Sequence, residues 1–459
     1  MRSLPLAAAA LAYLAALGWL RPASEAFDGL AFVRAAAAGG IDYGHALYLP
    51  LLRLAGVGDD GVDPVGRAKW VSALGALLAV VLLGRAARVR GAAPLRAGLV
   101  AGWFGLGALL VHEAGSIEPT TWTLATLLLA DAAAARHAQR PSAARLVTAL
   151  LVYAAALGFH VVSLCALPWL ARHAWPVRGS LPRAQAGIVL GAGLALLALA
   201  LAGGELGRYA RYWSGFLPSY SEGLASTLAA HAARGARLLG EGAPVLLAGG
   251  LVGAIALARA RTAEWLEGAL LAAPYLVAFL VLGKPLVGLL APLPLAAGLV
   301  LARVAARWPG PRGTLALGLG LALTLAHALP QALAWSRAPD EPRARAALFA
   351  RHVPAGSVLF SGPLANHFRF YHPELVVVAL PELWHQAFAR DRDAEPLAVV
   401  RAAVAAAQRP CVLTSEGAGF LVGDLGLAPE ALGLAEEKTL FLPENPRLAL
   451  FPLEPGASR

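Results

Sequence analysis

The chain has 459 residues, of which 58% are hydrophobic and only 14% are charged. Soluble domains are nearer a quarter charged, so this composition excludes an ordinary soluble enzyme and indicates a protein built mainly of membrane-spanning helices. The formal net charge is +10, but much of it is arginine in short connections between apolar segments, which sets membrane orientation and argues against a nucleic-acid partner.

About eleven apolar segments follow one another along the chain. We predict spans at Leu4–Leu20, Arg67–Leu83, Leu95–Val111, Glu118–Ala135, Leu146–Leu157, His160–Ala171, Ala184–Ala202, Ala243–Ala258, Trp265–Leu282, Pro285–Val304 and Thr314–Leu329. The first segment also has the layout of a secretory signal peptide. Cleavage would remove the leading anchor of the first loop, so we predict that this span is retained.

Arginines flank five of the connections, and cytoplasmic loops carry an excess of such residues. Each connection contributes at least one, namely Arg90, Arg140, Arg172, Arg259 and Arg303 in chain order. If all five connections are cytoplasmic, Leu146–Ala171 must cross outward and return as two half-length helices, hinged at Gly158–His160. The N-terminus is then cytoplasmic, and everything after Pro330 is external or periplasmic. We therefore predict a multi-pass protein of the inner (plasma) membrane.

The character of the chain changes after a charged linker at Trp335–Arg345. Beyond it, helix-like and strand-like segments alternate, which is typical of an α/β domain. The predicted helices are Ala344–His352 and Pro396–Gln408, and the predicted strands are Ser357–Phe360, Leu375–Leu380, Cys411–Thr414 and Arg447–Leu453. The expected fold is an α-helical polytopic membrane domain (residues 1–335, with a first external loop at 21–66) followed by a small external α/β domain (345–459).

The first external loop contains two amphipathic stretches, Phe27–Ala38 and His45–Leu54, that suit the membrane surface. Asp28 opens the first stretch and is a candidate general base, although a helix cap or an ordinary loop acid would explain it too. In the second stretch, His45 and Tyr48 are three residues apart and would share a helical face. Tyr43 and Tyr48 also fit simple interfacial anchors.

Further candidates fall near the same predicted external face. Glu118 begins a span, where an acid followed by proline also makes good helix-start chemistry. His160 lies at the predicted hinge, and an ionisable group at membrane depth is a functional candidate unless it simply bonds a neighbouring carbonyl. Lys284 is a cation that would suit a phosphate, but it could equally reach towards the interface. Arg208 and Arg211 belong to an aromatic and basic cluster in a predicted external loop, Gly203–Gly242, which suits an interface or lipid headgroups.

We find no glycine-rich phosphate loop, no Ser-His-Asp or Cys-His arrangement and no zinc spacing in the sequence. Gly56–Asp63 looks like a calcium loop but lacks the length and the terminal glutamate of an EF-hand. We therefore predict no cofactor, and the sequence does not decide whether a divalent metal assists.

Several of these positions together resemble the GT-C glycosyltransferases, and the protein O-mannosyltransferase-like branch in particular. Asp28 after the first span, leading into His45-Ala46-Leu47-Tyr48-Leu49-Pro50, is similar to that group's acid loop and juxtamembrane helix. Ser116-Ile117-Glu118-Pro119 looks like the start of its fourth span, and the segment from Gly158 to Pro168 looks like its short helical hairpin. Two departures are Gly29, where many relatives have a second acid, and Ala46, where proline is usual.

The resemblance implies an inverting transferase that uses a polyprenyl-phosphate-linked sugar as donor and a protein, lipid or glycan hydroxyl as acceptor. Asp28 would take the acceptor proton, and Lys284, Arg208 or Arg211 would stabilise the departing phosphate. Tyr43, His45, Tyr48, Glu118 and His160 would shape the substrate pocket. Two alternatives stay open, namely a transporter or flippase of lipid-linked or polar solutes, and an inactive relative that serves as an assembly subunit.

Overall fold

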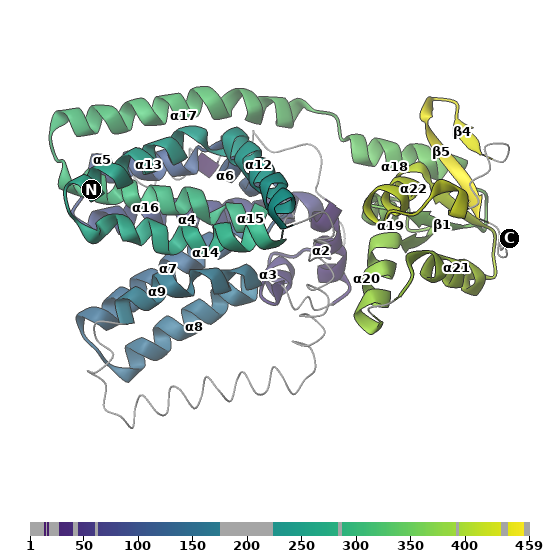
Figure 1. Ribbon diagram of the computed structural model, residues 1–459, viewed down its shortest axis with the longest axis horizontal. Coiled ribbons are helices and arrows are strands. Elements are labelled where there is room, and N and C mark those ends of the chain that lie inside the picture. Colours follow the sequence, from purple (N-terminus) through teal and green to yellow (C-terminus); the bar gives the residue numbers. More distant parts are fainter. Residues whose placement is uncertain are drawn as a thin grey trace. The chain divides into compact units, whose positions relative to one another are not determined.

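The computed structural model describes residues 13–14, 16–17, 27–39, 45–59, 63–174, 224–282, 287–391, 394–432 and 439–453. The chain divides into two compact units, a helical unit that ends at Ala338 and a second unit that begins at Pro339 and contains a β-sheet (Figure 1). Helix α2 (Phe27–Ala37) contributes its residues up to Arg34 to the second unit.

The helical unit contains long apolar helices together with several short ones. They are α3 (Tyr48–Leu54), α4 (Pro64–Val89), α5 (Pro94–Gly105), α6 (Ala108–Gly115), α7 (Thr120–Gln139), α8 (Ala143–Phe159), η2 (Val161–Ala166), α9 (Leu167–Ala174), α12 (Leu224–Gly242), α13 (Pro244–Arg259), η5 (Ala263–Trp265), α14 (Leu266–Leu282), α15 (Val287–Leu290), α16 (Pro292–Arg307) and α17 (Pro311–Arg337).

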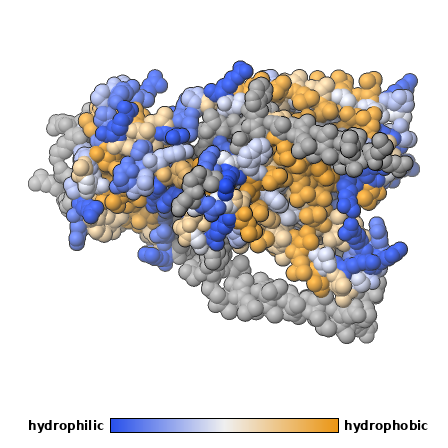
Figure 2. All heavy atoms as spheres, turned by 180° about the vertical axis from the view of Figure 1, so that it is seen from behind, coloured by the Kyte–Doolittle hydropathy of each residue, from blue (hydrophilic) through white to orange (hydrophobic). Residues whose placement is uncertain are grey.

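Among the described residues, three helical stretches are long and apolar enough to cross a membrane, and two sharply bent helix pairs could add two more. The three stretches contain α4, α14 and α17. Large apolar side chains such as Leu151, Leu251 and Leu315 are exposed on the helices, and Figure 2 shows apolar residues over a broad part of the helical unit. Such a surface suits lipid. We predicted eleven crossings, whereas the described residues support three to five. The predicted span Ala184–Ala202 lies outside the described residues.

Small residues allow the central helices of the helical unit to pack closely. A side chain at Gly75 of α4 would meet Thr121 and Trp122 of α7, and one at Gly298 of α16 would meet Leu83. Close approach of backbones through glycine is typical of helices that pack inside a membrane. Helix α4 therefore contacts both α7 and α16 and forms the centre of the bundle.

The predicted helical hairpin is present. Helix α8 ends at Phe159, whose ring stacks on Trp122 near the start of α7, with ring centroids 5.6 Å apart. After η2, helix α9 brings Arg172 to Asp131, nine residues further along α7. The chain therefore turns back on itself at His160, and α7 packs against both α8 and α9 (Figure 1).

Four sequence-based expectations need correction. The predicted span Leu95–Val111 is broken into α5 and α6, which are bent by 66°. Residues 224–242, expected to belong to an external loop, form α12, because this alanine- and leucine-rich stretch favours a helix. Helix α17 continues through Pro330 to Arg337, so the predicted linker at Trp335–Arg345 is too long. His45 precedes α3, which begins at Tyr48, so these two residues do not share one helical face.

The second unit is built around a five-stranded sheet in the order β2-β1-β3-β5-β4. Strand β1 is parallel to β2 and β3, and β5 is antiparallel to β3 and β4. The elements are α18 (Glu341–His352), β1 (Val358–Ser361), α19 (Ala365–Tyr371), β2 (Val376–Ala379), α20 (Leu380–Arg390), α21 (Pro396–Ala407), β3 (Cys411–Thr414), α22 (Ser415–Gly419), η6 (Phe420–Asp424), η7 (Pro429–Leu432), β4 (Leu440–Leu442) and β5 (Asn445–Leu453).

Both faces of this sheet are covered, as parallel strands require. Leu359 packs with Phe349 of α18 and Phe368 of α19 on one face. Its neighbour Phe360 points the other way and packs with Val400 and Val404 of α21. The strands predicted from the sequence agree with β1, β2, β3 and β5 to within two residues, whereas the short strand β4 was not predicted.

Candidate functional site

The first loop is joined to the turn of the helical hairpin. The backbone N–H of Leu47 donates a 2.8 Å hydrogen bond to the carbonyl oxygen of Gly158. A side chain at Gly158 would overlap Leu47, so the glycine permits this close approach. The rings of His45 and His160 meet edge to face, with centroids 4.8 Å apart. Two histidines that are far apart in the sequence are therefore neighbours in space.

His160 is held in place by the turn that it forms. Its Nδ1 accepts a hydrogen bond from the backbone N–H of Val162 at 3.3 Å, so in the neutral ring the proton lies on Nε2. Ser163 also ties the turn together, because its hydroxyl donates to the carbonyl of Ala156 at 2.9 Å and its carbonyl accepts from the hydroxyl of Tyr153 at 3.0 Å. His160 is 8% exposed, which suits a fixed polar group at the edge of a pocket.

Ser72 of α4 connects two more of the predicted residues. Its Oγ lies 3.0 Å from the hydroxyl of Tyr48 and 3.1 Å from both the backbone N and the backbone O of Glu118. Burial raises the pKa of Tyr48 well above its usual value, the carboxylates of Glu118 and Glu113 raise it further, and only the Ser72 hydrogen bond lowers it. The phenol therefore stays protonated.

The site cluster, as we call it, consists of residues from four separate parts of the chain, namely His45, Tyr48, Ser72, Glu118 and His160. Trp122 links the parts of the chain that carry these residues. Its indole N–H donates a hydrogen bond to the carbonyl of Val71 at 2.8 Å, and its ring stacks on Phe159. The cluster combines hydroxyl, imidazole and carboxylate groups, which suits a polar substrate with several hydroxyls.

No protein-family model and no curated protein matches the chain. The structure is similar to that of ArnT from Cupriavidus metallidurans in the apo state, with a TM-score of 0.60, 13% sequence identity and coverage of 99% of each chain. The chain has the fold of ArnT. ArnT from the same organism bound to undecaprenyl phosphate gives a TM-score of 0.58 and 16% identity, and covers 98% of this chain and 97% of that one.

The likeness to ArnT spans nearly the whole chain, but its low identity makes it a statement about fold. It confirms the resemblance to the GT-C glycosyltransferases at that level. Together with the apolar helices, it also supports a multi-pass membrane protein. The roles of individual residues must therefore be argued from this chain itself.

Five of the predicted site residues are not in the site cluster. Tyr43, Arg208, Arg211 and Lys284 lie outside the described residues. Asp28 lies on α2, in the part that clusters with the second unit, and the structure defines no geometry between it and the site cluster. The roles assigned to these five residues therefore stay predictions.

Two buried charged residues near the site cluster were not singled out from the sequence. Lys69 lies on α4 one turn before Ser72 and is 6% exposed. Glu113 lies on α6 and is 2% exposed, with its Oε1 3.5 Å from Nδ1 of His112. The signal for Lys69 was its presence inside an apolar helix in a chain with only three lysines, because burial of a charge is costly unless it is compensated.

The Ser72 hydroxyl gives a first testable prediction. We expect Ser72→Ala to lower the free energy of unfolding by about 1–3 kcal/mol, because it removes the buried atom that joins Tyr48 to Glu118. Chemical denaturation in detergent measures this. The control is Thr148→Ala, since that exposed hydroxyl bonds only within its own helix in the described structure, and we expect a change below about 0.5 kcal/mol. Equal effects of the two substitutions would contradict the prediction.

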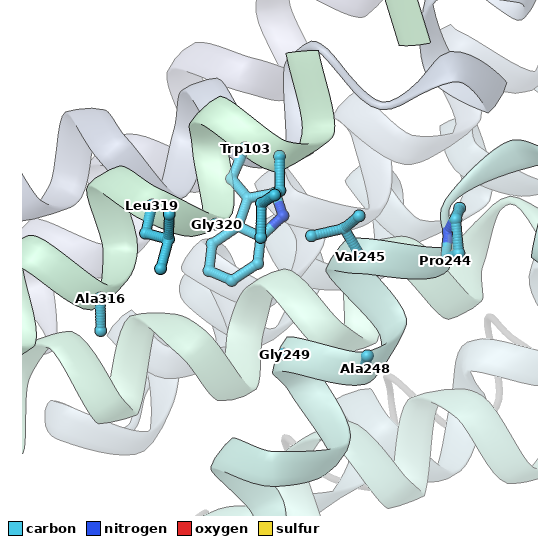
Figure 3. A pocket seen from close by; sticks show the side chains of 9 residues that line it. Trp103, Pro244, Val245, Ala248, Gly249, Ala316, Leu319 and Gly320 are labelled. Atoms are coloured by element: carbon cyan, nitrogen blue, oxygen red, sulfur yellow. The ribbon is translucent and has the colours of Figure 1, made fainter. Parts of the chain in front are cut away.

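An apolar groove of about 480 Å³ lies between α5, α13 and α17 of this ArnT-like bundle. Its lining residues include Trp103, Val245, Gly249, Leu319 and Gly320 (Figure 3). The indole N–H of Trp103 has no hydrogen-bond partner among the described residues. Because the rest of its lining is apolar, the groove suits a hydrocarbon chain, and it is distinct in chemistry from the site cluster.

The groove supplies a second testable prediction. A side chain at Gly320 would overlap the ring of Trp103, whereas the space around Gly318, half a turn away on α17, is open. We expect Gly320→Ala to destabilise the chain by about 1–3 kcal/mol through overpacking, and Gly318→Ala to be neutral or stabilising because alanine favours the helix. Thermal unfolding in detergent measures both. Similar melting temperatures for the two variants would refute this.

A second buried cluster, which we call the ion network, joins five elements of the bundle. It consists of Arg90, Asp131, Arg172, His173, Glu267 and Arg303. Arg172 lies 2.7 Å from a carboxylate oxygen of both Asp131 and Glu267, and Arg303 lies 2.8 Å from Glu267. The carboxylates are almost fully buried, with side-chain exposures of 6% for Asp131 and 3% for Glu267.

The ion network bears on the predicted orientation. Arg90, Arg172 and Arg303 come from three of the five arginine-flanked connections, and the structure brings them to one place. This agrees with the sequence-based prediction that these three connections lie on the same side of the membrane. That this side is the cytoplasm stays a prediction.

Proposed function

We propose that this protein is a membrane glycosyltransferase that moves a sugar from a polyprenyl-phosphate donor to an acceptor hydroxyl at the external face of the inner membrane. The site cluster carries the proposal. Two imidazoles meet at the turn after α8, and the Tyr48 hydroxyl bonds Ser72 close enough to Glu118 for that carboxylate to raise the pKa of Tyr48. The ArnT fold supports it, since one ArnT structure is bound to undecaprenyl phosphate.

In the proposed reaction, the carboxylate of Asp28 takes the proton from the acceptor hydroxyl. The acceptor oxygen attacks the anomeric carbon as the bond from that carbon to the phosphate oxygen breaks, and polyprenyl phosphate leaves with the bonding electrons. The configuration at the anomeric carbon is inverted. Catalysis then depends on positioning and on compensation of the charge that develops on the phosphate.

The remaining residues take binding roles in this proposal. Glu118, His160, His45, Tyr48 and Tyr43 form the pocket for the sugar and the acceptor. Lys284, Arg208 and Arg211 compensate the phosphate charge, and the buried ammonium of Lys69 is a further cation for this role. We propose no cofactor, so the chelator EDTA should leave the rate unchanged.

The function can be tested in proteoliposomes that contain the purified chain and a radiolabelled polyprenyl-phosphate sugar, with solubilised cell membranes as a pool of acceptors. We expect release of free polyprenyl phosphate and transfer of label into the acceptor pool. A transporter or flippase would instead move the donor between leaflets and leave it intact. An inactive relative would do neither, and either of these outcomes would refute the proposal.

A further inference from the structure

The groove between α5, α13 and α17 opens on the outer surface of the helical unit. The ring of Trp103 forms its floor, because a side chain at Gly249 of α13 or at Gly320 of α17 would overlap that ring. Leu319 and Leu323 of α17 border the groove and are 59% and 51% exposed. In a membrane such side chains face hydrocarbon. The volume of about 480 Å³ is in the range of pockets that hold small ligands.

A band of polar groups lies just beyond one end of the groove. In the part of α17 that follows the groove, the side chains of His327 and Gln331 bond the backbone carbonyl of Glu241 at 2.9 and 3.2 Å. Arg237 and Glu241 form an exposed ion pair at the end of α12. Helix α12 meets α13 at an angle of 103°, directly before the groove residue Pro244. Because exposed charges are costly inside the bilayer, this end of the groove lies just below the lipid headgroups.

The indole N–H of Trp103 is a polar group without a partner at this level. The residue is 5% exposed, and its Nε1 has no hydrogen-bond partner among the described residues. Figure 3 shows the nitrogen on the edge of the ring that faces Val245, a half-buried groove residue on the first turn of α13. The N–H of a buried tryptophan usually has a partner, and lipid offers no water to supply one. An acceptor on a bound lipid would satisfy this N–H.

The lining indicates which acceptor fits. No charged side chain is among the described residues that line the groove. A phosphate held there would be an unpaired charge in an apolar site, which is costly, so the acceptor has to be neutral. An isoprenoid chain carries no acceptor along its length, since its oxygen atoms are at the phosphate end. A diacyl phospholipid carries neutral ester carbonyls just below its headgroup, which is the level at which the groove begins.

We propose that the groove binds an acyl chain of an ester-linked phospholipid of the bilayer, whose ester carbonyl accepts a hydrogen bond from the indole N–H of Trp103. The side chain of Val245 moves aside as the carbonyl approaches, and the acyl chain supplies the dispersion contacts that an open groove lacks. This lipid site is separate from the site cluster and does not depend on the proposed transferase activity.

Two lipids that differ only in their linkage test the proposal. The full chain is purified in detergent, stripped of lipid and titrated with dioleoyl phosphatidylcholine or with its diether analogue, which lacks the carbonyls. Native mass spectrometry measures the dissociation constant of the first bound lipid. We expect the ester lipid to bind about fivefold more tightly, the effect of one net hydrogen bond. Trp103→Phe removes the N–H and should abolish this preference.

Three further variants separate the hydrogen bond from the packing of Trp103. Ala248→Leu fills the groove from an exposed position on α13 and should remove the tight first binding event of both lipids. Ala258→Leu is the matched control, because Ala258 is exposed on the same helix but does not line the groove. This variant should bind as the wild type does. Val245→Ala uncovers the N–H and should retain the preference for the ester.

Four outcomes would overturn the inference. They are equal binding of the two lipids by the wild-type chain, an ester preference that survives Trp103→Phe, wild-type binding by the Ala248→Leu variant, and loss of the preference in the Val245→Ala variant. Displacement of the ester lipid by an equal amount of a polyprenyl phosphate would also overturn it, by assigning the groove to an isoprenoid tail. None of these measurements involves sugar transfer, so failure of the lipid site is distinguishable from failure of the proposed function.

Discussion

Asp28→Asn should reduce sugar transfer by about 10²–10⁴-fold, which is the usual contribution of a general base. The substitution keeps the shape of the side chain and removes its ability to accept the acceptor proton. The measurement is the rate of polyprenyl-phosphate release in the proteoliposome assay. Expression level and the melting temperature of the purified protein should be unchanged, because the expected defect is chemical.

Asp59→Asn is the matched control for that substitution. Asp59 lies in the same predicted external loop, and its exposed carboxylate forms a surface pair with Arg67 at 3.5 Å. Exposed pairs of this kind contribute little to stability, so we expect wild-type transfer and wild-type melting. If the Asp28→Asn protein is folded and retains wild-type transfer, Asp28 is not the base.

Glu267→Gln should lower the free energy of unfolding by about 3–5 kcal/mol, the usual cost of removing one partner from a buried ion pair. Glu267 binds Arg90, Arg172 and Arg303, whose side chains are 8%, 17% and 29% exposed. Its neutralisation leaves these three guanidinium groups with Asp131 as the remaining carboxylate of the ion network. Titration with a denaturing detergent, followed by circular dichroism, measures the loss.

The control for this prediction is Glu241→Gln. Glu241 forms a pair with Arg237 on the surface of α12, where both side chains are largely exposed. Its neutralisation should leave the unfolding curve unchanged. An unchanged curve for the Glu267→Gln protein as well would mean that the ion network does not hold the bundle together.

Local features of this fold were accessible from the sequence. The short run Cys411–Thr414 was predicted as a strand, and β3 spans the same residues. The hairpin at His160 followed from charge, because arginines on both flanks of Leu146–Ala171 required the chain to return. The helix boundaries were less accurate, and α17 passes through Pro330 even though proline usually ends a helix.

The composition of the site was only partly accessible. Sequence reasoning selected His45, Tyr48, Glu118 and His160, and the structure brings these four together. It did not select Ser72, because a lone serine in an apolar helix carries no pattern. Sequence periodicity also could not predict which residues pair within the ion network, since Arg90 and Glu267 are 177 residues apart in the chain.

The ion network has a consequence for biogenesis. Helices α4 and α7 are synthesised early and carry Arg90 and Asp131, whereas Glu267 and Arg303 arrive with α14 and α16, much later in translation. A nascent chain that stops before α14 therefore holds two arginines against a single carboxylate. The carboxylate of Glu267, which pairs with both of these arginines, arrives only when α14 inserts, so the last third of the bundle completes the network that the first part begins.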